Sequence, residues 1–261
     1  MEYRPNPLKE KLARGETVYG TCICSFSPHM AGLAGNCGFD FVRIDNEHAW
    51  RQDESLEHVI RAALLSGCAP IVRIDKDEPY LARKALEVGA LGLIIPEVKE
   101  ASEVAAAVRA AKFPPLGERG FSTLCFSGRY GTANAAEWIA WSNTETLVGA
   151  MVEKPEAVEH IDEICAVEGL DFLLFGPSDY SVAIGLSAPD KDHPDVQRAI
   201  ERTAAAATAR GIHLMIGIAP SWKRETQQYA ALGYNMIEIG HDYSVLARAW
   251  KGALDEARQT R

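Results

Sequence analysis

Residues 148–179 read VGAMVEKPEAVEHIDEICAVEGLDFLLFGPSD, in which two apolar runs flank a more polar segment with helical spacing. The runs Val148–Glu153 and Phe172–Gly176 are apolar on both faces, which is typical of strands buried in a parallel sheet. Between them, Pro155–Val167 opens with a proline, which suits the first turn of a helix. Gly169 follows, and glycine readily takes the left-handed conformation that ends many helices. The stretch therefore predicts one strand–helix–strand unit.

The same alternation of apolar runs and amphipathic segments recurs along the whole chain of 261 residues. The predicted strands are Val18–Cys24, Phe39–Asp45, Ala69–Ile74, Gly92–Pro96, Val148–Glu153, Phe172–Gly176, His213–Ile218 and Met236–Gly240. The predicted helices between them are Leu56–Ser66, Tyr80–Val88, Ser102–Ala111, Pro155–Val167, Val196–Arg210 and Trp222–Leu232. Eight such units in about 250 residues favour one α/β domain, a (β/α)8 TIM barrel with parallel strands over residues 1–261. No G-x-G-x-x-G follows the first strand, which argues against an open dinucleotide-binding sheet.

Composition and charge narrow the classes of partner. The chain has 27 Lys and Arg residues against 36 Asp and Glu, a formal net charge of −9, and no basic run. Nucleic acid and anionic membranes are therefore poor candidates. Since no apolar stretch is long enough to span a bilayer and the first residues lack a secretory signal, we expect a soluble, cytoplasmic protein. The six cysteines include no C-x-x-C pair and are expected to be reduced and mostly buried.

Two segments fall outside the repeating pattern. Residues 114–132, rich in Gly, Pro and Ser, form the longest predicted loop. Because this loop comes after the fourth strand, we expect it on the active-site face, as a lid or substrate loop. Ser244–Arg258 is expected to form a last helix that covers the barrel or packs on a neighbouring subunit.

Two carboxylates stand at neighbouring strand ends, where barrels of this type carry their active sites. Glu153 ends the fifth predicted strand and Asp179 follows the sixth. Because adjacent strands lie about 4.8 Å apart, both side chains are placed to share one divalent ion. Mg²⁺ and Mn²⁺ suit two oxygen ligands with open positions for water and a chelating substrate, and Co²⁺ is compatible. The alternative is a structural role, with Asp179 as a helix cap and Glu153 in an ion pair.

Other polar residues follow the second and third strands. Arg73 leaves an apolar strand, so its guanidinium needs an anion, either a substrate oxygen or a structural glutamate. His48 follows the second strand, where Asp45 is placed to orient its ring for proton transfer. A purely structural loop histidine is the alternative, and the sequence assigns no role to His29 or His241.

Several segments together carry a family resemblance. They are Asn6–Gly15, Gly38–His48 with the sequence GFDFVRIDNEH, Val72–Arg73, Leu86–Ala90, Ile94–Pro96, Pro114–Gly120 with PPLGERG, Arg129–Gly131, Val152–Glu153, Val167–Asp171 and Gly176–Ser181 with GPSDYS. With these elements in this order, the sequence resembles the HpcH/HpaI aldolase family of metal-dependent pyruvate aldolases. The resemblance implies a TIM barrel, a divalent metal ion, and a 2-oxo acid and an aldehyde as small-molecule partners. It also implies a homohexamer, arranged as a trimer of dimers.

The resemblance assigns roles to individual positions of this chain. Glu153 and Asp179 match the two metal ligands of the family. His48, paired with Asp45, matches its proton-transferring histidine. Arg73 matches the arginine that holds the carbonyl oxygen of pyruvate.

Further roles are implied at positions that the strand-end argument did not reach. Glu87 matches an acidic residue that supports the histidine from a neighbouring subunit. The substrate carboxylate is implied to bind at Gly176, Pro177, Ser178 and Asp179, through the backbone N–H groups at the helix start. Three features depart from the family pattern, on the side where the aldehyde would bind: Asn46, the first strand with the His29-Met30 that follows it, and the segment Phe121–Ser127.

The sequence therefore predicts a divalent-metal-dependent aldolase that cleaves or forms 4-hydroxy-2-oxo acids. A decarboxylase that makes the same enolate from oxaloacetate is an alternative at the same site. A citrate-lyase-type acyl-CoA lyase would share the barrel, but no basic pocket for the CoA phosphates stands out. A non-catalytic barrel is the alternative from another class, and it would be expected to lack one of the site residues.

Overall fold

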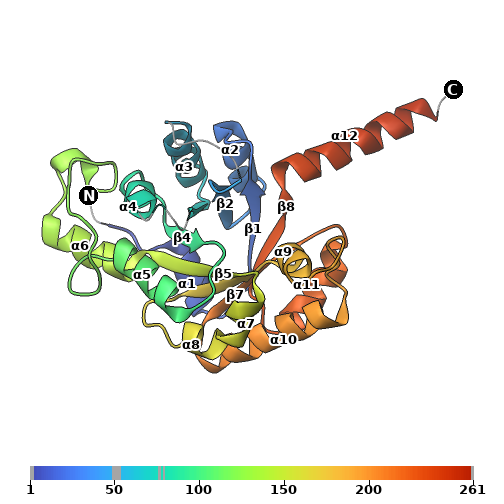
Figure 1. Cartoon of the computed structure of the whole chain (residues 1–261). Helices are drawn as coiled ribbons and strands as arrows, with labels where there is room; N and C mark the ends of the chain where they lie inside the picture. Colours follow the sequence, from blue (N-terminus) through green and yellow to red (C-terminus); the bar gives the residue numbers. More distant parts are fainter. Residues whose placement is uncertain (1–2, 49–53, 76–77, 79, 260–261) are drawn as a thin grey trace.

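Eight parallel strands pair in chain order and close into a barrel, with the last strand hydrogen-bonded to the first (Figure 1). This computed structural model describes residues 3–48, 54–75, 78 and 80–259. The strands are β1 (Val18–Ile23), β2 (Phe41–Asp45), β3 (Ala69–Arg73), β4 (Gly92–Ile95), β5 (Leu147–Val152), β6 (Phe172–Phe175), β7 (His213–Ile218) and β8 (Met236–His241). The predicted TIM barrel is thus confirmed, with each strand close to its expected position.

Helices surround the barrel, and most of them lie where the sequence predicted them. These are α3 (Ser55–Leu65), α4 (Tyr80–Glu87), α5 (Ala101–Ala111), α10 (Pro194–Ala209), α11 (Trp222–Ala231) and α12 (Asp242–Arg258). The predicted helix Pro155–Val167 is divided at His160 into two short helices, α7 (Pro155–Glu159) and α8 (Ile161–Cys165). In the described residues, four α-helices were not predicted: α1 (Pro7–Ala13), α2 (Pro28–Asn36), α6 (Ala135–Glu145) and α9 (Pro177–Ala183). Among the described residues, no helix combines the length and apolar character needed to cross a membrane.

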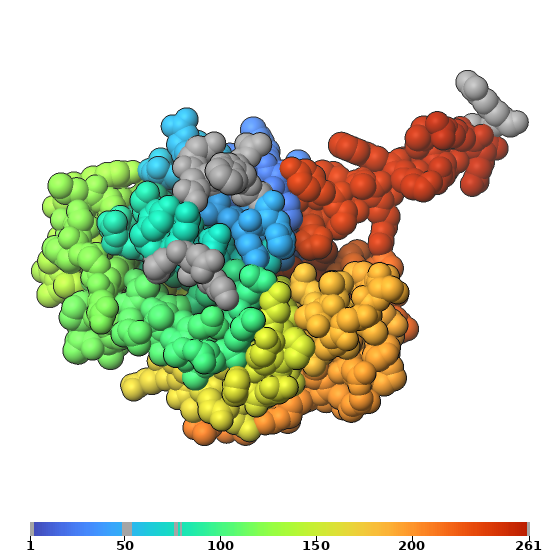
Figure 2. Space-filling view, viewed as in Figure 1, coloured from blue at the N-terminus to red at the C-terminus, as the bar shows by residue number. Residues whose placement is uncertain are grey.

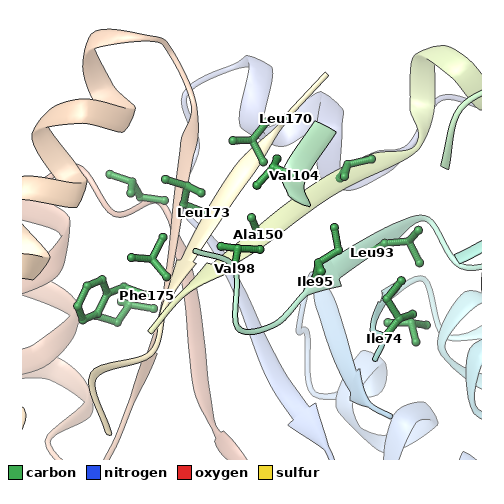
Figure 3. Packing of buried hydrophobic residues seen from close by; sticks show 14 of the residues in the cluster. Ile74, Leu93, Ile95, Val98, Val104, Ala150, Leu170, Leu173 and Phe175 are labelled. Atoms are coloured by element: carbon green, nitrogen blue, oxygen red, sulfur yellow. The ribbon is translucent and has the colours of Figure 1, made fainter. Parts of the chain in front are cut away.

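The alternation of side chains along each strand divides the core into two layers. Leu173 and Phe175 of β6 point outward and pack with Ala150 of β5 in the layer between barrel and helices (Figure 3). Phe172 of β6 instead belongs to the cluster inside the barrel. Gly149 on the neighbouring strand leaves space for the Phe172 ring, since a Cβ there would lie 2.3 Å from it. The amino-terminal half of the barrel is therefore filled by apolar side chains, and it supports the more polar half above it.

The segment 114–132 does not lie on the active-site face of its own chain, which corrects the expectation. The backbone N–H of Arg119 donates to the Lys112 carbonyl, and Lys112 Nζ donates to the carbonyl of Thr146, just before β5. The Ser127 hydroxyl donates to the carbonyl of Leu86, near the end of α4. These partners lie at the amino-terminal end of the barrel. The physical reason is that the loop follows helix α5, and each helix returns the chain to the end where strands begin.

The predicted last helix is present, and it begins as α12 directly after β8. It projects away from the barrel, as both whole-chain views show (Figures 1 and 2). Trp250 is 71% exposed and Leu254 is 50% exposed on this helix. In the single chain these two large apolar side chains are therefore exposed to solvent. Such exposure is expected of a helix that packs on a neighbouring subunit.

Candidate active site

A buried ion pair at the ends of β2 and β3 forms one wall of the site. Asp45 and Arg73 are direct partners in the strand register. Arg73 Nη2 lies 2.5 Å from Asp45 Oδ2, and Arg73 Nε donates to Oδ1 at 3.1 Å. Burial alone would raise the pKa of Asp45, but the bonds and charge of Arg73, with the charge of Arg43, outweigh it and lower that pKa to about 2. Asp45 is therefore ionised, and it holds the Arg73 guanidinium in one orientation.

A second buried ion pair, which the sequence patterns did not single out, lies below the first. Arg43 Nε lies 2.6 Å from Glu238 Oε2, and Arg43 Nη2 donates to Glu238 Oε1 at 2.8 Å. Arg43 Nη1 is also 3.8 Å from Asp45 Oδ2, so the two pairs are linked. A signal for Arg43 was available, because it is two residues before Asp45 and so points to the same face of β2.

The two predicted metal ligands stand at the ends of β5 and β6. Glu153 is 3% exposed, and its Oε1 accepts a hydrogen bond from the backbone N–H of Glu97 at 2.6 Å. Burial, followed by the charges of Asp179 and Glu47, raises the pKa of Glu153 to about 7, although the Glu97 N–H bond and Arg73 lower it. A buried carboxylate next to a second carboxylate is stabilised by a cation between them. The donor set therefore fits a hard divalent ion.

Gly176 keeps the space between these two strands open. A Cβ at this position would lie 2.6 Å from the Met151 methyl carbon and 3.3 Å from Glu153 Oε2. Since both contacts are tighter than usual, a larger residue here would push on the Met151 side chain and on Glu153. Helix α9 then starts at Pro177 and carries Asp179 in its first turn.

His48 lies at the rim of the site, and Asp45 contacts its backbone. The Asp45 Oδ1 atom accepts the backbone N–H groups of Glu47 at 3.1 Å and His48 at 3.4 Å. The His48 side chain is 68% exposed, and its Nε2 lies 4.0 Å from Glu47 Oε2. In the described chain the expected bond from Asp45 to the ring is therefore replaced by bonds to the loop backbone and to Arg73. Glu47, which the sequence patterns did not assign, also contacts Arg73, with its Oε2 2.6 Å from Arg73 Nη1.

One cavity of about 770 Å³ joins most of these groups at the mouth of the barrel. Its walls include Asp45, Arg73, His48 and the segment Gly176–Asp179, together with His241 at the start of α12. His241 thus lines the cavity, and His29 lies in the first turn of α2, which follows the carboxyl end of β1.

Glu87 is separate from this cavity within one chain. It is the last residue of α4, and its Oε1 accepts a hydrogen bond from Arg83 Nη1 at 3.4 Å. The end of α4 lies toward the amino-terminal end of the barrel, whereas His48 lies at the opposite end. A contact between Glu87 and the histidine therefore requires a neighbouring subunit, as the sequence comparison implied, and it stays a prediction.

Comparison with known proteins agrees with this architecture. The family model of the HpcH/HpaI aldolase/citrate lyase family matches residues 19–249. A 2-keto-3-deoxy-L-rhamnonate aldolase from Klebsiella pneumoniae subsp. pneumoniae is 33% identical over 254 residues, which cover 94% of this chain and 90% of the relative.

Solved structures agree over the full barrel. A HpcH/HpaI aldolase/citrate lyase family protein from Burkholderia cenocepacia J2315 has a TM-score of 0.89 at 31% identity, covering 97% of this chain and 99% of its own. The citrate synthase SbnG has a TM-score of 0.88 at 29% identity, covering 98% of each chain. Since the family match spans most of the chain and the barrel carries its polar groups at the carboxyl ends of the strands, the chain belongs to the HpcH/HpaI aldolase/citrate lyase family and is a carbon–carbon lyase of the aldolase type.

Proposed function

We propose that this chain is a divalent-metal-dependent aldolase that cleaves or forms 4-hydroxy-2-oxo acids, with a 2-oxo acid such as pyruvate and an aldehyde as its small-molecule partners. The observation that carries this proposal is the buried Glu153 carboxylate, whose pKa is raised by the charge of Asp179, together with Asp179 and the Arg73 guanidinium on the walls of one cavity. The family match supports the reaction class. Relatives that are 33–34% identical carry the name 2-keto-3-deoxy-L-rhamnonate aldolase, which makes that compound the first substrate to try.

Glu153 and Asp179 would hold the metal ion, which is Mg²⁺, Mn²⁺ or Co²⁺ in this proposal. When bound, the ion supplies Lewis acidity that stabilises negative charge on the oxygen of the 2-oxo group. The backbone N–H groups of Ser178 and Asp179, with Gly176 and Pro177 shaping the turn, are proposed to receive the substrate carboxylate.

Arg73 is proposed to donate hydrogen bonds to the carbonyl oxygen of the substrate. Its guanidinium is already oriented by Asp45 and Glu47, so little reorganisation is needed when charge develops on that oxygen. The planar guanidinium presents its N–H donors in a fixed fork, which suits it to hold the oxygen of an enolate.

His48 is proposed to move the proton at the 4-hydroxyl oxygen. In cleavage, its ring accepts that proton while the C3–C4 bond breaks, the aldehyde leaves, and the electron pair of the bond remains on the enolate of the 2-oxo acid. In the forming direction, His48 returns the proton to the new alkoxide. The exposed ring at the rim can reach an incoming aldehyde, and Glu47 Oε2 lies 4.0 Å from its Nε2.

A homohexamer, arranged as a trimer of dimers, remains part of the proposal. The exposed apolar residues of α12 support packing on a neighbour. The position of Glu87, away from the cavity of its own chain, supports a contribution across subunits. We propose that the enzyme acts in the cytoplasm.

The experiment measures 2-oxo acid release from a panel that contains 2-keto-3-deoxy-L-rhamnonate, other 4-hydroxy-2-oxo acids and oxaloacetate. Each substrate is tested as purified, after EDTA, and after added Mn²⁺ or Mg²⁺. We expect chelation to abolish cleavage and metal to restore it. Turnover that resists chelation would indicate a lysine imine instead, and turnover of oxaloacetate alone would indicate a decarboxylase.

A pair of matched variants assigns the metal to its proposed ligands. Glu153→Gln removes the negative charge at constant shape, and we expect it to lower kcat/KM on the order of 10²-fold or more, because several kcal/mol of charge stabilisation are lost. Glu156→Gln, on the neighbouring helix α7 and half-exposed beside Lys99, is the control and should retain turnover. Equal activity of the two variants would contradict the assignment.

A further inference from the structure

Two cysteines lie together at the mouth of the catalytic cavity. Cys22 is on β1, and Cys24 comes directly after that strand. Their Sγ atoms are 3.5 Å apart. Within the described part of the chain, these thiols and Asp45 form a cluster of metal-type side chains whose ligand atoms lie within 4.8 Å of one another. Cys24 lines the same cavity as Asp45 and Arg73.

The surroundings of this cluster disfavour a metal ion. Both oxygens of Asp45 are already bonded to Arg73. The Arg43 guanidinium lies 3.8 Å from Asp45 Oδ2 as well. A cation bound by the two sulfurs and this carboxylate would therefore lie beside the guanidinium groups of Arg43 and Arg73, which repel it at short range in a buried environment. What remains is a pair of neighbouring thiols beside paired arginine and carboxylate groups.

We propose that Cys22 and Cys24 form a peroxide-reactive dithiol, which closes to an intrachain disulfide and thereby reversibly inactivates the catalytic site. The loss of activity on oxidation rests on the aldolase function proposed above. The formation of the disulfide does not depend on that function and is argued from the positions of the two sulfur atoms.

The environment assigns different roles to the two thiols. Cys24 is partly exposed in the cavity, and its pKa is lowered, first by the hydrogen bond from Cys22 and then by the charge of Arg43, against burial and the charges of Asp45 and Asp242. Cys22 is fully buried, and its pKa is raised by that same hydrogen bond and by burial. An accessible thiol with a lowered pKa, in contact with a second thiol, is the arrangement of a redox-sensitive cysteine and its resolving partner.

The reaction proceeds in two balanced steps. The Cys24 thiolate attacks one oxygen of hydrogen peroxide, the O–O bond breaks, and hydroxide leaves and is protonated to water, which makes a sulfenic acid on Cys24. The Cys22 sulfur then attacks the Cys24 sulfur, the S–O bond breaks, and a second water leaves with the Cys22 proton. In total, two thiols lose two electrons and two protons, and one peroxide becomes two waters. A dithiol reductant reverses the oxidation by thiol–disulfide exchange.

Closure would distort the site because the bonded sulfurs must approach to about 2.05 Å. Residues i and i+2 of an extended chain share one face but lie about 6.6 Å apart along it, wider than the Cβ spacing of about 4 Å in a disulfide, so the backbone around Cys24 has to shift. That backbone is tied to the start of α12: Asp242 Oδ1 accepts the Cys24 N–H at 3.1 Å, and Asp242 Oδ2 accepts the Ser25 N–H at 3.1 Å. On the other side, Cys22 is in register with Arg43, which contacts Asp45. The shift is therefore transmitted to both walls of the cavity mouth.

The test uses the full chain with Cys37→Ser, because cleavage after lysine and arginine leaves Cys22, Cys24 and Cys37 on one peptide, residues 15–43. The reduced protein is treated with hydrogen peroxide, and free thiols are then alkylated. We expect peptide 15–43 to lose two hydrogens and to resist alkylation. On the same samples, we expect loss of most aldolase turnover and its recovery with dithiothreitol.

Variants separate this pair from the other thiols. Cys24→Ser should make turnover insensitive to peroxide, each sample being normalised to its own reduced state. Cys22→Ser should turn the reversible loss into one that dithiothreitol does not restore, because Cys24 then oxidises further to sulfinic acid. Cys125→Ser should behave as the parent does. Far-ultraviolet circular dichroism verifies that each variant is folded.

The outcomes are distinguishable from those of the proposed function. Absence of the disulfide from peptide 15–43, or reversible inactivation that persists in Cys24→Ser, overturns the dithiol. A disulfide that leaves turnover unchanged overturns its effect on the site. A reduced enzyme without aldolase turnover refutes the proposed function and the inactivation with it, while the mass measurement still decides whether the disulfide forms.

Discussion

Replacing Asp45 by asparagine should destabilise the folded chain in a pH-dependent way. The pKa of Asp45 falls from an ordinary 3.8 to about 2, with Arg73 and Arg43 as the cause, and the residue is only 4% exposed. At about 1.4 kcal/mol per pKa unit, the ionised form contributes about 2 to 3 kcal/mol to the free energy of unfolding at neutral pH. Because the folded pKa is below the unfolded one, this contribution is complete above the unfolded pKa and is lost as the pH falls through the folded value.

The assay is urea unfolding of the parent and Asp45→Asn at neutral pH and at about pH 3. We expect the parent to be more stable by about 2 kcal/mol or more at neutral pH, and this difference to shrink by about half near pH 3. Asp192→Asn, at an exposed loop position, is the control and should show little difference at either pH. A difference in unfolding free energy that is equally large at both pH values would refute the reasoning. Protonation of Asp45 in the parent would then have removed none of the stability that the ionised pair is expected to contribute.

Two further perturbations follow from the geometry. Arg43→Met leaves Glu238 as an unpaired buried charge and should lower the free energy of unfolding by about 3–5 kcal/mol, whereas the double variant with Glu238→Leu should recover much of this loss. Urea unfolding of the parent, both single variants and the double variant measures the coupling between the two residues. Losses that simply add in the double variant would contradict the coupling. Gly176→Ala should lower turnover and raise the Mn²⁺ concentration that half-maximal cleavage requires, because a Cβ would lie 3.1 Å from the Cβ of Glu153, a proposed metal ligand. Gly32→Ala, where a Cβ meets nothing within 4 Å, is the matched control, and equal loss in both variants would remove the argument.

Features that depend on local pattern were available from the chain alone. Apolar runs on both faces, helix-ending glycines and the spacing between Glu153 and Asp179 predicted the strand order and placed both carboxylates on adjacent strand ends. The signals for strands, helices and turns lie within short segments of the chain. Because all strands of a parallel barrel end at the same face, a residue that follows a strand is placed at that face without knowledge of the tertiary structure. The helices α1 and α2 were missed, although Asn6 and Ser27, whose side chains cap them, are also local signals.

Other features required the closed barrel. The ion pair of Arg43 with Glu238 joins residues 195 positions apart, and it exists because β8 closes onto β1 beside β2. Alternation along a strand shows that a side chain points inward, but it does not show which inward groups meet. For the same reason, sequence placed Asp45 next to the His48 ring, whereas in the barrel the register gives its carboxylate to Arg73. The sequence by itself thus determined the barrel and the strand ends that carry its chemistry, and the tertiary structure decided which charges and thiols share a space, since that depends on packing across the barrel interior.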